Sequence, residues 1–214
     1  MAKFYTTVPK IVKRIYPQAW FNFNEPNQRV YLTFDDGPTP GVTEAALDLL
    51  ALHGAKATFF CLGKNVVNHP EIYQRILQEG HSVGNHTMHH ELGWKTGVQD
   101  YLNSIDECGK LVDSKLFRPP YGKIRPRQVR AVQEKYRMVM WEVLTGDFLE
   151  NRSVELCTHA FLNYTRPGSI VVFHDSHKAA ERMLPTLEKG LAHFTALGFE
   201  FAALPMDGQL PSKQ

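Results

Sequence analysis

The feature of this sequence that most restricts its fold is a regular alternation of short apolar segments with amphipathic ones. Strands are predicted where β-branched, aromatic and apolar residues concentrate, at residues 29–34, 56–62, 81–84, 115–118, 136–143, 169–174 and 199–204. Helices are predicted where apolar residues recur at helical spacing, at residues 42–50, 70–79, 98–112, 125–135, 153–164 and 183–197, the last with Pro185 near its start. Such alternation is typical of a parallel sheet, either open and doubly wound or closed into a barrel.

Length and composition agree with one globular domain. Hydrophobic residues make up 43% of the 214 residues and charged residues 21%, which excludes a disordered, collagenous or coiled-coil chain. The net charge of +2 is too small for the electrostatic footprint of a nucleic-acid-binding protein. The three cysteines are far apart, which supports neither a disulfide framework nor a cysteine zinc site. The apolar runs are shorter than the roughly 20 residues of a transmembrane helix, so we predict no transmembrane segment.

The N-terminal segment is basic and contains a short apolar pattern. Its basic residues are scattered and no uninterrupted apolar block occurs, so it does not resemble a secretory signal. One face of a predicted short helix is apolar and the other is basic; the apolar residues are Val8, Ile11, Val12 and Ile15. We favour a terminal helix that covers one end of the domain, and a short helix at a membrane surface remains the alternative.

Residues of chemical interest gather where predicted strands end. They are Asp35 and Asp36, His86 to His90, Arg118 to Tyr121, Asp147, and His174 with Asp175. In parallel α/β proteins the loops at the carboxyl ends of the strands converge, and catalytic groups gather there. These five segments therefore predict one active site.

Two of these segments predict a metal site. His86 and His90 are four residues apart and could face one metal from a helical turn, and His89 offers a further imidazole. The adjacent carboxylates of Asp35 and Asp36 repel each other unless positive charge lies nearby. Two histidines and one carboxylate form a common catalytic zinc set that leaves a position for water. The alternatives are a turn in the DDGPTP segment and a solvated histidine-rich loop.

The same residues resemble the motifs of a known family. They are TFDDGP at 33–38, HTMHH at 86–90, RPPYG at 118–122, WEVLTGDF at 141–148 and VVFHD at 171–175. In this order they resemble the five motifs of the polysaccharide deacetylases, also called carbohydrate esterase family 4 or the NodB homology family. The resemblance implies a distorted, TIM-barrel-like (β/α) barrel of seven or so parallel strands, and metal-dependent removal of acetyl groups from acetylated sugars.

The resemblance also implies domain boundaries. It covers residues 29–204 as the catalytic domain. Residues 1–28 are then predicted to be an N-terminal extension that packs on the barrel, and residues 205–214 a C-terminal tail.

The resemblance assigns the metal and base roles by position. It makes Asp36, His86 and His90 the ligands of a divalent metal and Asp35 the general base, with Arg118 holding Asp35. Zinc is the preferred metal from the ligand types, and cobalt, nickel or iron also suit them.

The remaining catalytic and substrate-binding roles follow in the same way. The Tyr121 backbone N–H would stabilise the oxyanion, and His174, oriented and charged by Asp147, would donate a proton to the leaving amine. Tyr121, Trp141 and Phe148 are candidates to contact the sugar, although core packing is the favoured interpretation for Trp141.

Other polar and aromatic residues carry weaker expectations. The Thr87 hydroxyl would brace the histidine loop, and Trp94 could present a face to a sugar ring. Asp175 is predicted to cap the helix that follows it.

The chain departs from the family pattern at Glu142, Phe148 and Val172. These departures affect the sugar groove, and hence the polymer accepted, and leave the catalytic set intact.

We therefore expect a metal-dependent N-deacetylase of the chitooligosaccharide or peptidoglycan type. An O-acetyl esterase acting on a polymer such as acetylxylan and a catalytically inactive sugar-binding protein are the alternatives. The absence of a visible signal predicts a cytoplasmic protein, and association with the cell envelope is also compatible with the sequence. The oligomeric state is not determined.

Overall fold

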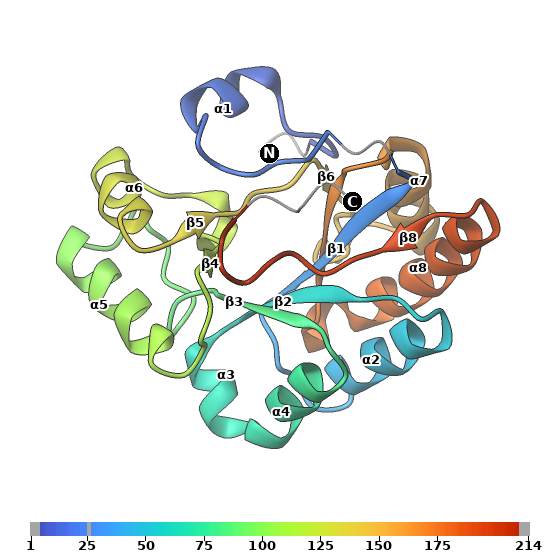
Figure 1. Ribbon diagram of the computed structural model, residues 1–214, viewed down its shortest axis with the longest axis horizontal. Coiled ribbons are helices and arrows are strands. Elements are labelled where there is room, and N and C mark those ends of the chain that lie inside the picture. The colour runs from blue at the N-terminus through green and yellow to red at the C-terminus, as the bar shows by residue number, and fades with distance from the viewer. Residues whose placement is uncertain (1–4, 25–26, 210–214) are drawn as a thin grey trace.

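The chain folds into a curled parallel sheet surrounded by helices (Figure 1). The computed structural model describes residues 5–24 and 27–209. Seven strands lie in the order β5-β4-β3-β2-β1-β7-β6, and β8 pairs with β1 outside this path. The strand pairs are parallel throughout. The expected distorted (β/α) barrel is confirmed, and it stays open between β5 and β6.

Strands and helices alternate along the chain from β1 onward. The strands are β1 (Arg29–Asp35), β2 (Ala57–Cys61), β3 (Ser82–Asn85), β4 (Leu116–Phe117), β5 (Arg137–Met138), β6 (Val143–Leu144), β7 (Ile170–His174) and β8 (Glu200–Phe201). The helices are α1 (Lys10–Ile15), α2 (Thr43–Leu52), α3 (Gly63–Asn68), α4 (Pro70–Gln78), α5 (Val98–Gly109), α6 (Pro126–Gln133), α7 (Val154–Tyr164) and α8 (His177–Ala196), with a short 3₁₀ helix η1 (Pro120–Gly122).

Several predicted bounds were wrong. The strand predicted at 136–143 is two strands, β5 and β6, because the chain crosses between them from one edge of the sheet to the other. The last long helix begins at His177, so Pro185 lies in its interior and not near its start. Helix α3 was not predicted, and α5 ends at Gly109 instead of residue 112.

Strand β1 shows how the barrel sorts its side chains. Val30, Leu32 and Phe34 belong to the large apolar cluster that joins the sheet to the surrounding helices. The alternate residues point the other way, because side chains along a strand alternate between faces. Tyr31 packs in the separate apolar cluster with Trp20, Phe60, Leu116, Val139, Ile170 and Leu204. Asp35, the last residue of β1, continues this inward-facing series to the carboxyl end.

The N-terminal segment lies against the open edge of the sheet. Trp20 forms a bridge with Val139 between β5 and β6, and Thr7 forms one with Val143. The buried Glu142 carboxylate accepts hydrogen bonds from Asn22 (2.6 Å) and Lys13 (3.3 Å). Backbone pairing and a buried carboxylate thus join this segment to the strands that flank the opening.

Helix α1 only partly covers the body of the protein. Val8 and Val12 pack against a neighbouring apolar cluster, whereas Ile11 and Ile15 are exposed. The expectation that all four residues form one covered face was therefore wrong. In Figure 1 the helix lies at the top of the molecule, in the gap between α6 and α7.

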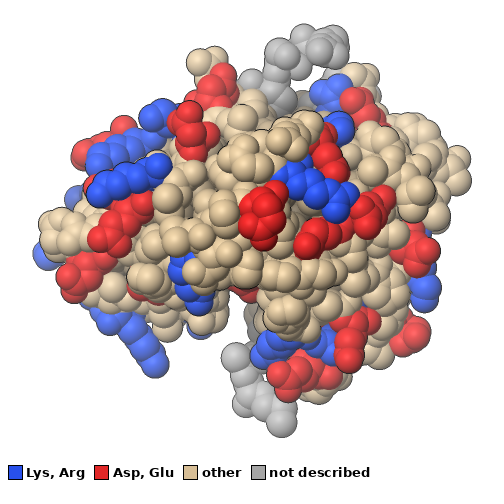
Figure 2. Space-filling view, turned by 90° about the horizontal axis from the view of Figure 1, so that it is seen from below, with Lys and Arg blue, Asp and Glu red and all other residues tan. Residues whose placement is uncertain are grey.

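The surface and the cysteines complete the description. On the face shown in Figure 2, acidic and basic side chains are interspersed. The three cysteines are free and buried, which confirms the absence of a disulfide framework. None of the described helices is long and apolar enough to cross a membrane.

Candidate active site

A pocket of about 290 Å³ opens at the carboxyl ends of the strands. It brings together residues from all five sequence motifs, whereas Arg118 and Asp147 are not part of the lining. Its lining residues are Asp35, Asp36, His86, His90, Tyr121, Gly122, Trp141, Leu144, Phe148, Val172, His174 and Lys178.

Asp35 is held at the base of this pocket by a buried arginine. Arg118 is fully buried, and its Nη1 donates to Asp35 Oδ1 and to Thr33 Oγ1, both at 2.7 Å. Its other donors bond the carbonyl oxygens of Val139 (3.2 Å) and Met140 (2.9 Å). Burial lowers the pKa of Arg118 and the facing Asp35 carboxylate opposes that effect. The contact orients one Asp35 oxygen and supplies the cation that a buried carboxylate needs.

Asp36 points to the two histidines instead. Its Oδ1 lies 3.2 Å from His90 Nε2 and 3.8 Å from His86 Nε2, and the three candidate ligand atoms lie within 4.8 Å of one another. Asp36 Oδ1 is buried and has no hydrogen-bond partner of acceptable geometry among the described residues. Ligand atoms of a tetrahedral zinc ion stand about 3.3 Å apart. The donor set and its orphaned oxygen therefore fit a divalent metal.

The surroundings prepare these ligands. Burial raises the pKa of Asp36, but the close His90 imidazole and the charges of the nearby histidines outweigh burial and leave this pKa well below its usual value. His86 Nδ1 lies 2.8 Å from the Arg118 carbonyl oxygen, which requires the proton on Nδ1 and leaves Nε2 free to bind metal. Burial lowers the pKa of His86 to about 4, so this imidazole is neutral.

The histidine segment is a loop and not the expected helical turn. Thr87 and His90 have positive φ angles of 68° and 66°. The Thr87 hydroxyl accepts hydrogen bonds from the backbone N–H groups of His90 (3.0 Å) and Glu91 (3.3 Å), so its bracing role is confirmed. His89 is exposed and outside the ligand cluster. The i, i+4 spacing was right for the pair, but side-chain bracing of a loop brings the imidazoles together.

Backbone strain concentrates at this site. Among the described residues, the non-glycine residues with positive φ are Asp36, Thr87, His90 and Tyr121. Such conformations cost of the order of 1 kcal/mol each and persist where the surrounding structure enforces them. All four belong to the pocket or to the loop that carries its histidines.

His174 and Asp147 form a second charged pair across the pocket. Asp147 is fully buried, and it accepts from the His174 backbone N–H (2.7 Å) and lies 2.8 Å from His174 Nδ1. Burial lowers the pKa of His174, but the Asp147 carboxylate outweighs burial and raises this pKa to about 9. The imidazole is therefore protonated near neutral pH, with Nε2 left for another partner.

Aromatic side chains line one side of the pocket. Tyr121 is 60% exposed and its ring lies 4.5 Å from that of His90, while the Phe148 ring lies 4.8 Å from that of His174. Trp141 is half-buried and serves both surfaces: it packs against two buried apolar clusters, as the favoured interpretation of a core residue expects, and it also lines the pocket. Trp94 does not line the pocket.

Asp175 corrects a prediction. Helix α8 begins after Ser176, and the buried Asp175 carboxylate caps nothing there. It accepts instead from the Gly37 N–H (2.9 Å) and the Thr43 hydroxyl (2.6 Å). Burial raises the pKa of Asp175 to about 8. The residue joins the end of β7 to the loop that carries Asp36.

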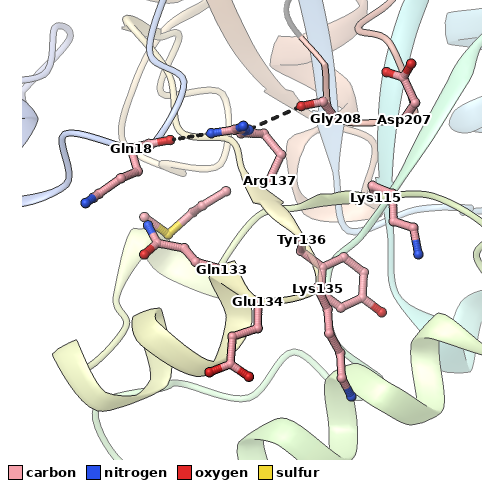
Figure 3. A pocket seen from close by; sticks show the side chains of 10 residues that line it. Gln18, Lys115, Gln133, Glu134, Lys135, Tyr136, Arg137, Asp207 and Gly208 are labelled. Atoms are coloured by element: carbon pink, nitrogen blue, oxygen red, sulfur yellow. Dashed lines mark hydrogen bonds between the residues drawn. The ribbon is translucent and has the colours of Figure 1, made fainter.

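A second pocket, of about 320 Å³, lies at the opposite end of the strands (Figure 3). Arg137 crosses it and donates to the carbonyl oxygens of Gly208 (3.2 Å) and Gln18 (3.3 Å). Its lining contains neither histidine nor cysteine. In parallel (β/α) folds this end serves stability, and the lining here offers no catalytic set.

Comparison with known proteins agrees with the site. The sequence pattern of the family described as "Polysaccharide deacetylase" matches residues 23–141, more than half of the chain. The chain belongs to the polysaccharide deacetylase family. The matched part includes the Asp35–Asp36 pair, the histidine loop and Arg118.

Individual relatives of this deacetylase family cover most of the chain. The chain is 36% identical over 184 residues to the peptidoglycan-N-acetylglucosamine deacetylase PgdA of Listeria monocytogenes, covering 83% of this chain but only 38% of PgdA. It is 33% identical to a chitooligosaccharide deacetylase of Azorhizobium caulinodans, covering 84% of this chain and 89% of that protein. A crystal structure of the peptidoglycan N-acetylglucosamine deacetylase Bc1960 superposes with a TM-score of 0.85 at 31% identity, covering 96% of this chain and all of that one.

Some pocket residues of this deacetylase-family chain were not predicted. Gly122, Leu144 and Lys178 line the pocket, and Val172 was noted only as a departure from the family pattern. The signal for Val172 was available, because it lies two residues before His174 on β7 and therefore shares its face. Leu144 had no such signal, because its place depends on the pairing of β6 with β7. Lys178 enters from α8, and nothing in its local sequence indicates the direction of its side chain.

Proposed function

We propose that the chain is a metal-dependent hydrolase that removes N-acetyl groups from saccharides of the chitooligosaccharide or peptidoglycan type. One observation carries the proposal. A single pocket holds the Asp36, His86 and His90 donor set together with the Asp35 carboxylate and the His174 imidazole. The names of the relatives, which describe deacetylases of N-acetylated carbohydrates, support the substrate class.

The metal centre belongs to the proposal. Asp36, His86 and His90 would hold a divalent cation, with zinc preferred from one carboxylate and two imidazoles, and cobalt, nickel or iron as alternatives. When bound, such a cation lowers the pKa of a water molecule and polarises a carbonyl group.

Asp35 acts as the general base. Its Oδ1 is occupied by Arg118, so the other carboxylate oxygen is the one available to accept a proton from the attacking water. Arg118 keeps this carboxylate oriented for that proton transfer. The Tyr121 backbone N–H is assigned to the oxyanion that develops on the acetyl oxygen.

His174 acts as the general acid. A sugar amine leaves readily only when its nitrogen is protonated, so cleavage of an amide requires a proton donor. Asp147 keeps His174 protonated. Because Asp147 is bound to Nδ1, the other ring nitrogen, Nε2, is the one that donates the proton. Hydrolysis then yields acetate and the protonated free amine, and both residues return to their starting protonation states after proton exchange with solvent.

The apolar lining suits an acetyl methyl group and a sugar ring. Trp141, Leu144 and Val172 supply apolar surface, and Tyr121 and Phe148 supply aromatic rings at the mouth. An aromatic face binds the C–H face of a sugar ring by burying its apolar area.

Acetate release from N-acetylglucosamine oligomers tests the proposal. We expect release by the purified protein, loss after chelation, and recovery on addition of zinc. Acetate release that survives complete chelation would contradict metal dependence, and absence of release from the zinc-loaded protein on oligomers of several lengths would contradict the substrate class.

A matched variant separates the metal from its surroundings. Asp36→Asn should lower zinc affinity, measured by calorimetry, and lose activity in parallel. Asp175→Asn can still accept from the Gly37 N–H through its amide oxygen and can donate from its NH2 group to the Thr43 hydroxyl, so it should leave zinc affinity within a fewfold of wild type. Equal loss of zinc affinity in the two variants would contradict the assigned ligand set.

A further inference from the structure

Helix α1 presents an unusual exposed face. Lys10, Ile11, Arg14 and Ile15 lie side by side on it, because residues i, i+1, i+4 and i+5 share one side of a helix. Ile11 is 61% exposed and Ile15 is 59% exposed. Lys10 and Arg14 are exposed and form no ion pair with the described residues. We call these four residues the α1 face.

The opposite side of α1 fixes the helix to the body of the protein. Val12 and Tyr16 pack on the neighbouring apolar cluster, Lys13 contacts the buried Glu142, and the Tyr16 hydroxyl donates to the Ile124 carbonyl oxygen at 3.2 Å. The α1 face therefore points to solvent, and no other described element covers its two isoleucines.

The net positive charge of the chain lies in the segment that carries this face. The first 24 residues contain four Lys or Arg and no Asp or Glu, whereas the remaining 190 contain 20 basic and 22 acidic residues. The net positive charge of the whole protein thus comes from its N-terminal segment. Charge asymmetry of this kind points to an anionic partner.

The exposed isoleucines distinguish between anionic partners. Single exposed apolar side chains are ordinary, and Leu52 on α2 and Val67 on α3 are examples. The α1 face differs because two branched aliphatic side chains one turn apart adjoin two cations that form no ion pair within the described part of the chain. A nucleic acid or a soluble polyanion would engage the cations and leave the isoleucines in water. A bilayer offers phosphate groups to the cations and acyl chains to the isoleucines.

We propose that the α1 face docks the protein reversibly on the surface of an anionic lipid bilayer. Ile11 and Ile15 insert at the boundary between headgroups and acyl chains, and Lys10 and Arg14 contact lipid phosphates. Two isoleucines and a few cations make a weak anchor, so binding depends on lipid charge and on ionic strength. The docking surface is separate from the catalytic pocket and does not depend on the deacetylase reaction.

Vesicle flotation with the full chain tests this docking. We expect the protein to float with vesicles that contain phosphatidylglycerol, not with pure phosphatidylcholine vesicles, and less at high salt. Ile11→Ser with Ile15→Ser should lower the partition coefficient about tenfold. The matched control, Leu52→Ser with Val67→Ser, removes equally exposed apolar side chains elsewhere and should bind as wild type.

A second pair of variants tests the charges. Lys10→Gln with Arg14→Gln should lower partition about tenfold, since each cation near an anionic surface contributes about 1 kcal/mol. Lys110→Gln with Lys189→Gln removes two exposed lysines from other helices and should have no effect. Circular dichroism and acetate release by each variant would verify that the fold is intact.

Three outcomes would overturn the proposal. They are no partition of the wild type into anionic vesicles, equal losses in the control variants, and binding that the isoleucine variant retains in full. The last would identify the segment as a surface for soluble polyanions. Loss of flotation together with a change from dimer to monomer in gel filtration would instead assign the α1 face to self-association.

Discussion

The two ends of the barrel carry pockets of similar size and different chemistry. The pocket at the carboxyl ends has a volume of about 290 Å³ and the one at the opposite end about 320 Å³. At the carboxyl ends, Asp35 faces the buried Arg118 and Asp147 faces His174. At the opposite end, Arg137 bonds only backbone carbonyl oxygens among the described residues, and Lys135 and Asp106 form an exposed ion pair.

The two pockets therefore differ in the burial of their charged side chains, and neither volume nor the number of charges separates the candidate active site from the other pocket. A charge removed from water must be paired, and the pairing shifts its pKa and fixes its orientation. An exposed charge is screened and contributes little. Substitutions at both ends of the barrel test this comparison.

The largest effect is expected from Asp35→Asn. The variant removes the proposed base but preserves shape and the acceptor for Arg118, so kcat for acetate release should fall about 10³-fold or more. Zinc affinity should remain near wild type because Asp35 is not in the proposed ligand set. Measurement of acetate release over time checks kcat, and calorimetry checks zinc affinity. Turnover near the wild-type rate would show that Asp35 is not the general base.

Arg118→Met should have the next largest effect, on stability. The substitution leaves the Asp35 carboxylate buried without its cation, and breaking such a pair costs about 3–5 kcal/mol of unfolding free energy. Urea denaturation followed by circular dichroism measures the loss. A loss below about 1 kcal/mol would mean that water or structural relaxation stabilises the unpaired Asp35 carboxylate. The two ends of the barrel would then not differ in their dependence on buried charge pairs.

The pH dependence of stability should report the His174–Asp147 pair. Its folded pKa of about 9 is higher than the ordinary 6.5, so the stability that protonated His174 contributes is complete below about pH 6.5 and is lost as pH rises through 9. In the chelated protein we expect a loss of roughly 2–3 kcal/mol between about pH 6 and about pH 10, relative to His174→Gln. Asp147→Asn should largely remove this difference. A flat difference between wild type and His174→Gln would show that the pair is not charged as described.

The smallest effect is expected at the opposite end, from Arg137→Met. The guanidinium loses two hydrogen bonds to carbonyl oxygens and its position over the Trp20 ring, and no buried carboxylate is left unpaired. The unfolding free energy should fall by about 1 kcal/mol or less. Acetate release should be unchanged. A loss of unfolding free energy comparable to that of Arg118→Met would show that the opposite end also depends on a buried charge.

Most of the fold was predictable because its signals are local. The strand that carries Asp35 and the strand that carries His174 are short apolar runs followed directly by charged residues, and helices separate them. The split of residues 136–143 into β5 and β6 was not predictable. Apolar density is the same in a continuous strand and in a segment that crosses between two edges of a sheet, so periodicity does not distinguish them.

The residues of the candidate site likewise fall into those that local motifs predict and those that depend on distant contacts. The sequence identified the residues of the candidate metal cluster and of both charged pairs, since each lies in a short contiguous motif. It misjudged Asp175, because its partners are more than 130 residues away in the chain: Gly37 in the loop after β1 and Thr43 at the start of α2. It also treated the apolar residues of the N-terminal segment as one covered face, because helical periodicity does not say which part of a face finds a neighbour.

The sequence by itself determined the parallel barrel, the chemical groups at the strand ends and their order along the chain, because periodicity and short motifs depend only on neighbouring residues. The packing of distant segments was needed to show that Asp175 accepts from Gly37 and Thr43 instead of capping α8, and that Ile11 and Ile15 of α1 stay in water. Those outcomes depend on burial, and burial is set by how segments distant in the chain pack against one another.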